Sequence, residues 1–126
     1  MRRLSIAITL CAVVAAWGCA SNAPPSGRGM SPEYVEGGVI FRFYDPEAKH
    51  VYVVGDFNNW SVKADPMVDA NGDGEWTLFY TLGPGVYQYK FVVDGTSWLP
   101  DPRNPESAPD GFDGRNSVVR IAPPGS

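Results

Sequence analysis

The sequence predicts an all-β fold in which two antiparallel sheets pack face to face. Hydrophobic residues make up 44% of its 126 residues, and in several runs they alternate with polar residues, as the two faces of a strand require. The 14 glycines and 12 prolines interrupt these runs and favour many turns over long helices. About six strands in roughly 85 residues, without a helical pattern or a repeat of fixed period, are typical of a β-sandwich.

The strands are expected wherever this alternation appears along the chain. Five of these strands are marked by a recognisable run, at residues 38–44, 51–57, 75–82, 86–94 and 116–122. In the fourth of them, Tyr89 and Phe91 fall on one face and Lys90 on the other. Trp76 lies in a regularly alternating strand and is expected in the core. His50, the only histidine, precedes a strand without an evident partner, which favours a role in a turn over one in catalysis.

The first 18 residues predict a signal peptide. Arg2 and Arg3 precede an apolar run of about 14 residues, shorter than the roughly 20 needed to span a bilayer. Small residues surround Cys19, a pattern that resembles a bacterial lipoprotein signal, in which this cysteine becomes the lipidated first residue of the mature chain. We therefore expect a lipid anchor at Cys19 in the bacterial cell envelope, with a secreted or periplasmic protein as the alternative. In lipoprotein signals of this sort, an aspartate after the cysteine would suggest retention in the inner membrane. Ala20 and Ser21 follow Cys19 instead, so the outer membrane is the favoured location of the anchor.

A flexible tether is predicted over residues 19–36, which are small, polar and rich in proline. The folded domain is predicted over residues 37–122. Because Cys11 lies in the signal and Cys19 at its end, this domain has no thiol for a disulfide or a thiolate metal site. Its stability must come from a hydrophobic core.

The charge of the mature chain argues against two classes of partner. Removal of Arg2 and Arg3 leaves 8 basic against 14 acidic residues and changes the net charge from −4 to −6. Nucleic acids and anionic membrane surfaces both require a clustered positive face. We therefore expect no nucleic-acid partner, and membrane contact through the lipid anchor alone.

Four ordered motifs resemble a known family. They are VYVVGDFNNW, GDGEW, LGPGVYQYKFVVDGTSWLPDP and GRNSVVRI, and together they are similar to carbohydrate-binding module family 48. This family includes the glycogen-binding module of the AMP-activated kinase β-subunit and the N-terminal domains of isoamylases and glycogen branching enzymes. The resemblance covers residues 39–121. It implies an immunoglobulin-like antiparallel β-sandwich of about six to eight strands that binds α-1,4-linked glucan without catalysis or a cofactor.

The same resemblance implies a set of sugar-binding residues. Trp60 and Trp98 correspond to the aromatic platforms that stack on glucose rings, because the C–H faces of a sugar suit a flat, rigid side chain. Lys90 corresponds to a hydroxyl donor and Asn116 to an amide that donates and accepts. Phe112 stands where the kinase module has a leucine that the sugar chain surrounds. Either tryptophan taken alone fits the core equally well.

Two other interpretations remain open. Asp69, Asn71, Asp73 and Gly74 match the first half of a calcium-binding loop, but Tyr80 occupies the position of the required glutamate, so a glycine-rich hairpin turn fits better. These residues are thus weak metal candidates, and no metal is expected. The alternative function is a protein-docking module for an amylase-type glycoside hydrolase or an envelope protein, since members of the family can keep the fold without the sugar site.

Overall fold

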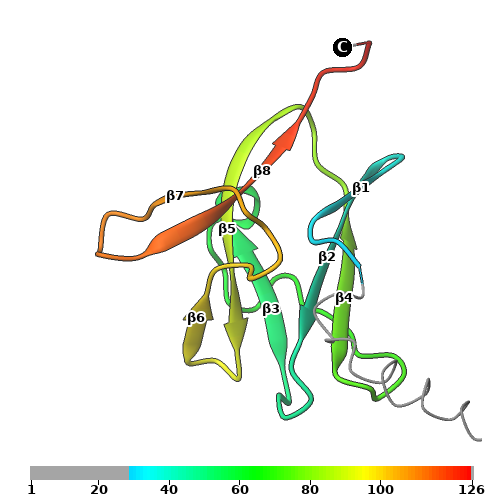
Figure 1. Ribbon diagram of the computed structural model, residues 1–126, viewed down its shortest axis with the longest axis vertical. Coiled ribbons are helices and arrows are strands. Elements are labelled where there is room, and N and C mark those ends of the chain that lie inside the picture. Colours follow the sequence, from blue (N-terminus) through cyan, green and yellow to red (C-terminus); the bar gives the residue numbers. More distant parts are fainter. Residues whose placement is uncertain (1–28, 126) are drawn as a thin grey trace, which may run out of the picture.

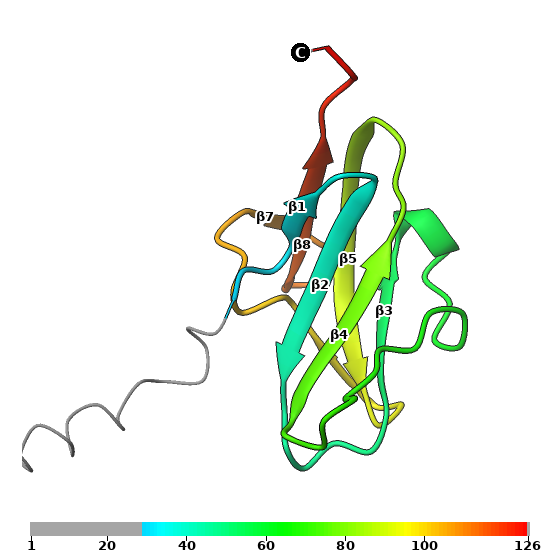
Figure 2. The same ribbon diagram turned by 90° about the vertical axis from the view of Figure 1, so that its right-hand side faces the viewer.

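The computed structural model describes residues 29–125, which form two antiparallel sheets packed face to face (Figures 1 and 2). The predicted β-sandwich is confirmed. The predicted signal peptide and Cys19 lie outside the described residues. Within residues 29–125, no helix has the length and apolar character needed to cross a membrane.

The two sheets differ in size. The three-stranded sheet has the order β1-β2-β4, with β1 at Glu33–Val35, β2 at Gly38–Tyr44 and β4 at Glu75–Tyr80. The five-stranded sheet has the order β3-β5-β8-β7, with β3 at Val51–Gly55, β5 at Gly85–Val93, β8 at Arg115–Ile121 and β7 at Ser107–Pro109. The fifth strand, β6 at Ser97–Leu99, pairs with one end of β5. A 3-10 turn, η2 at Asp56–Asn58, follows β3.

The core lies between the sheets and is rich in aromatic rings. The ring centroids of Phe41 and Tyr89 are 4.8 Å apart, and those of Phe43 and Phe91 are 5.1 Å apart. Each pair joins β2 of one sheet to β5 of the other. The burial of these apolar side chains supplies most of the driving force for joining the sheets. The predicted inward face of residues 86–94 is therefore confirmed by Tyr89 and Phe91, both fully buried.

Three strands were not predicted. β1, β6 and β7 have three residues each, too few for an alternating pattern to be recognised. Each is held by a longer neighbour: β1 pairs with β2, β6 with β5 and β7 with β8. The five predicted strands correspond to β2, β3, β4, β5 and β8, with ends that differ by a few residues.

The predicted boundary between tether and domain is wrong. The tether was predicted to reach residue 36, but Glu33–Val35 form β1 and pair with β2. Ser31 is only 3% exposed, and its hydroxyl donates a hydrogen bond to the Asp101 carboxylate and accepts one from the backbone N–H of Arg42 at 2.9 Å. These contacts join a segment of small and polar residues to the fold, so the domain begins before residue 37.

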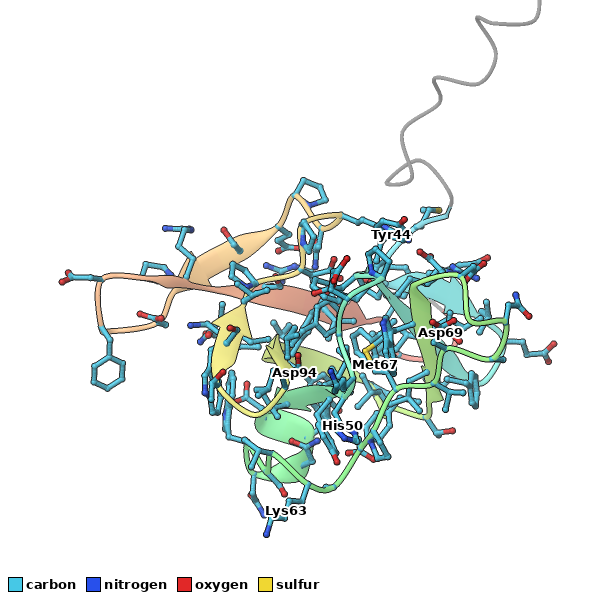
Figure 3. All side chains as sticks on the ribbon, turned by 90° about the horizontal axis from the view of Figure 1, so that it is seen from below. Tyr44, His50, Lys63, Met67, Asp69 and Asp94 are labelled. Carbon is cyan, nitrogen blue, oxygen red and sulfur yellow. The ribbon has the colours of Figure 1, made fainter. Side chains whose placement is uncertain are left out.

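The acidic segment before β4 forms a turn. Val68 and Thr77 pair across it through two backbone hydrogen bonds of 2.9 Å, which confirms the predicted hairpin turn. The Asp69 carboxylate accepts hydrogen bonds from the backbone N–H groups of Asp73, at 3.1 Å, and Gly74, at 2.9 Å. Figure 3 shows Asp69 at this turn, near the buried Met67. Across residues 29–125, no group of three or more His, Cys, Asp or Glu side chains is arranged to hold a metal ion.

The Asp94 carboxylate stabilises the segment directly before β3. The backbone N–H groups of Lys49 and His50 donate to Asp94 Oδ1 at 2.8 and 2.9 Å, and Figure 3 shows His50 and Asp94 at neighbouring turns. These backbone hydrogen bonds hold the pKa of Asp94 below its usual value. His50 thus lies in the connection directly before β3, where its backbone is hydrogen-bonded to Asp94.

Candidate functional site

The loop after β3 sends one aromatic side chain into the core and another to the surface. The Phe57 ring lies 4.9 Å from that of Tyr80 in the opposite sheet, so η2 is anchored between the layers. Asn59 and Trp60 then adopt φ values of 58°, in the left-handed region that non-glycine residues seldom occupy. This change in backbone direction places Trp60 in the lining of a surface groove.

Asn58 and Gly55 stabilise this turn. The Asn58 side chain accepts a hydrogen bond from the Gly55 N–H at 3.0 Å and donates one to the Val53 carbonyl at 3.0 Å. Gly55 is required because a Cβ there would lie 2.5 Å from the Gln88 carbonyl oxygen of β5. The sequence GDFNNW therefore contains the residues that bend the chain sharply against β5.

The groove lies on the outer face of the five-stranded sheet. Since Tyr89 and Phe91 of β5 point into the core, the alternate residue Lys90 points outward. All five predicted sugar-binding residues line this groove, which has a volume of about 500 Å³. They are Trp60, Lys90, Trp98, Phe112 and Asn116. The fold thus gathers side chains from the η2 loop, β5, β6, β8 and the β7–β8 hairpin, although their roles in binding stay predictions.

Two of the aromatic side chains are open to solvent. Trp98 in β6 pairs with Val92 of β5 and is 44% exposed. Phe112 lies in the tip of the β7–β8 hairpin and is 88% exposed. In Figure 1, β6 and this hairpin project to the same side of β5. Large exposed aromatic groups that share one groove are typical of a binding surface rather than of a core.

Asp56 connects Trp60 to the sheet. Its Oδ1 accepts a hydrogen bond from Trp60 Nε1 at 3.1 Å, and its Oδ2 accepts one from the Gln88 backbone N–H at 2.8 Å. The Gln88 side-chain oxygen in turn accepts a hydrogen bond from Asn116 Nδ2 at 2.8 Å. This series of contacts orients the indole ring of Trp60 and the amide of Asn116 relative to β5.

Lys90 is paired with Asp110 in the groove. Lys90 Nζ lies 2.8 Å from Asp110 Oδ2, and the side chains are 15% and 11% exposed. The Lys90 ammonium group, together with the backbone N–H groups of Phe112 and Gly114, lowers the pKa of Asp110 to about 2. The carboxylate is therefore ionised at neutral pH and neutralises the charge of Lys90.

The sequence did not predict three residues that line the groove: Asp56, Gln88 and Asp110. The alternation along β5 places Gln88 on the same face as Lys90, and this pattern would have identified it. Asp110 is 20 residues from Lys90 in a polar loop, and no local pattern predicts their contact.

The chemistry of the groove suits a neutral ligand with apolar faces and many hydroxyl groups. Its aromatic rings offer flat apolar surface, and the amides of Gln88 and Asn116 offer donors and acceptors. The metal candidates Asp69, Asn71 and Asp73 do not line it. Cys19 lies outside the described residues.

Comparison with known proteins relates this groove to a family. Residues 39–125 match the model of the glycogen recognition site of AMP-activated protein kinase. The 1,4-alpha-glucan branching enzyme of Pseudomonas putida is 49% identical over 74 residues, which are 56% of this chain and 10% of the enzyme. The mouse 5'-AMP-activated protein kinase subunit beta-2 is 42% identical over 57 residues, which are 45% of this chain and 20% of the subunit.

The branching enzyme of Rubrobacter xylanophilus is 40% identical over 76 residues, which are 57% of this chain and 10% of the enzyme. The chain therefore spans only a tenth to a fifth of these relatives, and the similarity concerns one module of each. The match to the family model, by contrast, covers most of this chain, including β3 to β8 in full and all of β2 except its first residue. The chain belongs to the family of carbohydrate-binding modules that contains the glycogen recognition site of AMP-activated protein kinase.

Proposed function

We propose that the protein binds α-1,4-linked glucan, such as glycogen, starch or maltooligosaccharide, in the groove of the five-stranded sheet. The observation that carries this proposal is the convergence of Trp60, Trp98 and Phe112 with Lys90 and Asn116 in one groove. The tryptophan rings stack on the C–H faces of glucose units, while the ammonium and amide groups bind hydroxyls. Because the ligand is uncharged, its affinity changes little with salt concentration.

The proposed role is binding without catalysis. Glycoside hydrolysis generally requires two carboxyl groups, one of them a general acid with a raised pKa. The groove contains Asp56 and Asp110, but Asp56 holds Trp60 and Gln88, and Asp110 holds Lys90. The pKa of Asp110 is lowered, to about 2, which is the opposite of what a general acid needs.

Affinity electrophoresis tests the proposal. The purified protein runs in native gels cast with and without glycogen, beside Trp60→Ala and Trp98→Ala. The matched control is Phe79→Ala, because Phe79 is 52% exposed but belongs to β4 of the other sheet. We expect glycogen to retard the wild type and the control, and to retard both tryptophan variants far less. Equal mobility of the wild type with and without glycogen would refute sugar binding.

The proposed setting is the bacterial cell envelope, with the module anchored through lipid on Cys19. The support is the signal-like segment before Cys19, and acyl chains contribute about 0.8 kcal/mol per buried methylene to membrane binding. Metabolic labelling with palmitate in a bacterial host tests it: label enters the wild type but not Cys19→Ser. A wild-type chain without label, recovered in the medium or the periplasm, would favour the alternative of a secreted or periplasmic protein.

A second candidate function is docking to a protein partner such as an amylase-type glycoside hydrolase. It is favoured by a second groove, of about 540 Å³, whose lining includes Tyr34, Leu82, Pro84 and Ile121. An apolar groove of this kind suits a hydrophobic segment of another protein. Docking would be favoured over sugar binding by two results together. The protein binds a purified amylase-type enzyme and Leu82→Asp abolishes this binding, while glycogen in the gel does not retard the wild type.

A further inference from the structure

One carboxylate connects two parts of the groove that lie far apart in the sequence. Asp110 Oδ2 accepts the hydrogen bond from Lys90 Nζ of β5 at 2.8 Å. Its Oδ1 accepts hydrogen bonds from the backbone N–H groups of Phe112, at 2.7 Å, and Gly114, at 3.0 Å. The backbone N–H of Asp110 also donates to the Gly114 carbonyl at 3.0 Å. Asp110 therefore contacts both the strand and the hairpin tip.

The hairpin tip depends on these contacts for its shape. Phe112 is 88% exposed, so packing contributes little to the position of its ring. Gly111 and Asp113 on either side have positive φ values, of 87° and 73°, a region that glycine enters freely and aspartate more often than most other residues, so the backbone makes a tight turn on both sides of Phe112. A Cβ at Gly114 would lie 2.7 Å from Asp110 Oδ2, so the glycine leaves the space that the carboxylate occupies. The Asp110 carboxylate is thus built into the turn that presents Phe112.

The other oxygen of the carboxylate restrains Lys90. A lysine side chain has a flexible four-carbon stem and three rotatable N–H donors. The bond to Asp110 Oδ2 directs one donor and leaves two for a ligand. The pairing of opposite charges also makes this part of the groove neutral, which suits an uncharged polysaccharide rather than an anionic one.

We propose that Asp110 is a positioning residue of the glucan groove, which holds the Phe112 turn through Oδ1 and the Lys90 ammonium through Oδ2. The inference rests on the proposed glucan function. It assigns to one side chain, whose two oxygens both accept hydrogen bonds from the protein, the task of placing an aromatic contact and a hydroxyl donor together. Two substitutions separate these tasks. Asp110→Ala removes both oxygens, whereas Asp110→Asn keeps one oxygen for the turn and directs an amide donor toward Lys90.

Calorimetric titration with maltoheptaose measures these effects in a double-mutant cycle with Phe112→Ala. In the wild type, we expect Phe112→Ala to weaken binding about fivefold. In the Asp110→Asn background it should have the same about fivefold effect, because the turn is kept. In the Asp110→Ala background its effect should fall below about twofold, because the ring is no longer held in place. A change in overall stability alone would not produce this difference between backgrounds.

The matched control is Asp113→Asn. Asp113 is an exposed acid in the same hairpin tip, its φ of 73° suits asparagine, and its side chain makes no hydrogen bond to the other residues in the described part of the chain. We expect it to bind maltoheptaose as the wild type does. Thermal unfolding of each variant verifies that it is folded, and if Asp110→Ala does not fold, Asp110→Asn still tests the Lys90 contact.

The outcomes separate this inference from the function on which it rests. A wild type that binds no maltoheptaose overturns the proposed function and the inference with it. If the wild type binds maltoheptaose and both Asp110→Ala and Asp110→Asn bind it with the same affinity as the wild type, the positioning role alone is overturned. The same holds if Phe112→Ala costs as much affinity in the Asp110→Ala background as in the wild type.

A measurement without sugar tests the structural part directly. Heteronuclear NMR relaxation reports the picosecond to nanosecond motion of the Phe112 and Gly114 amides. We expect both amides to be more mobile in Asp110→Ala than in the wild type, and unchanged in Asp110→Asn. Equal mobility in all three proteins would contradict the assignment of the turn to the Asp110 carboxylate.

Discussion

Replacement of Tyr89 by phenylalanine tests how the buried polar cluster stabilises the sandwich. The ring of Tyr89 is fully buried, and its hydroxyl donates to Asp101 Oδ2 at 2.7 Å and accepts from Asn104 Nδ2 at 3.0 Å. Asp101 is itself only 3% exposed, and Ser31 also donates to its carboxylate. Burial, together with the nearby Asp101 charge, raises the pKa of Tyr89, so the hydroxyl remains protonated and is a donor at any pH of interest.

The expected loss follows from the partners that remain. Asp101 loses a donor but keeps Ser31 and the backbone N–H of Arg103, at 2.9 Å. Asn104 loses an acceptor but still donates to the Val118 carbonyl at 2.8 Å. A hydrogen bond to a charged group contributes about 1.5–3 kcal/mol, so we expect Tyr89→Phe to lower the free energy of unfolding by about 2 kcal/mol. For a domain of this size this corresponds to a melting temperature about 10 °C lower.

Urea denaturation of Tyr89→Phe and Tyr87→Phe provides the assay. Tyr87 lies two residues earlier on β5 and packs against the same core, but its hydroxyl donates to the Gly83 carbonyl at the surface, at 2.9 Å. We expect this control to lose less than about 0.5 kcal/mol. If Tyr89→Phe were as stable as Tyr87→Phe, the cluster around Asp101 would not contribute the stability assigned to it.

Three further predictions concern ion pairs, pH and calcium. Arg103 makes a bidentate pair with Glu75, at 2.7 and 2.8 Å, and their side chains are 5% and 13% exposed. Arg103→Met leaves the Glu75 carboxylate without this partner, so urea denaturation should show a free energy of unfolding about 2–3 kcal/mol lower. A loss below about 0.5 kcal/mol would show that the pair is dispensable. Because the pKa of Asp110 falls from 3.8 to about 2 on folding, its ionised form stabilises the fold above pH 4, and this contribution is lost as the pH falls toward 2. The difference in melting temperature between the wild type and Asp110→Asn should therefore shrink over that range, and a difference that grows toward acid would contradict the assigned sign. Both oxygens of the Asp69 carboxylate accept hydrogen bonds from backbone N–H groups, so millimolar calcium should leave the melting temperature unchanged. A rise of several degrees that a chelator reverses would contradict this expectation and support calcium binding at the turn.

The sequence predicted the long strands because each carries its own evidence. The strands β2 and β5 have seven and nine residues. This length is enough for the alternation of apolar and polar side chains to distinguish an inner from an outer face. The same alternation placed Lys90 outward and Tyr89 inward, as observed. The three-residue strands carry no such signal. They form because a longer neighbour offers unpaired N–H and C=O groups, which is a property of the assembled sheet.

The candidate site divides in the same way. The resemblance to the family identified Trp60, Lys90, Trp98, Phe112 and Asn116, and the structure gathers all five in one groove. The contacts that orient them could not be read from the motifs, because their partners are remote in sequence: Asp56 and Gln88 are 32 residues apart, and Lys90 and Asp110 are 20 apart.

The sequence alone therefore determined the fold class, the faces of the long strands and the family. The tertiary structure decided where the domain begins, through the hydrogen bond between Ser31 and Asp101, which are 70 residues apart in the sequence. It also decided which carboxylates orient the side chains of the groove. The physical reason is that alternation and turn preferences act over a few residues, whereas a hydrogen bond between distant strands exists only after the chain has packed its core.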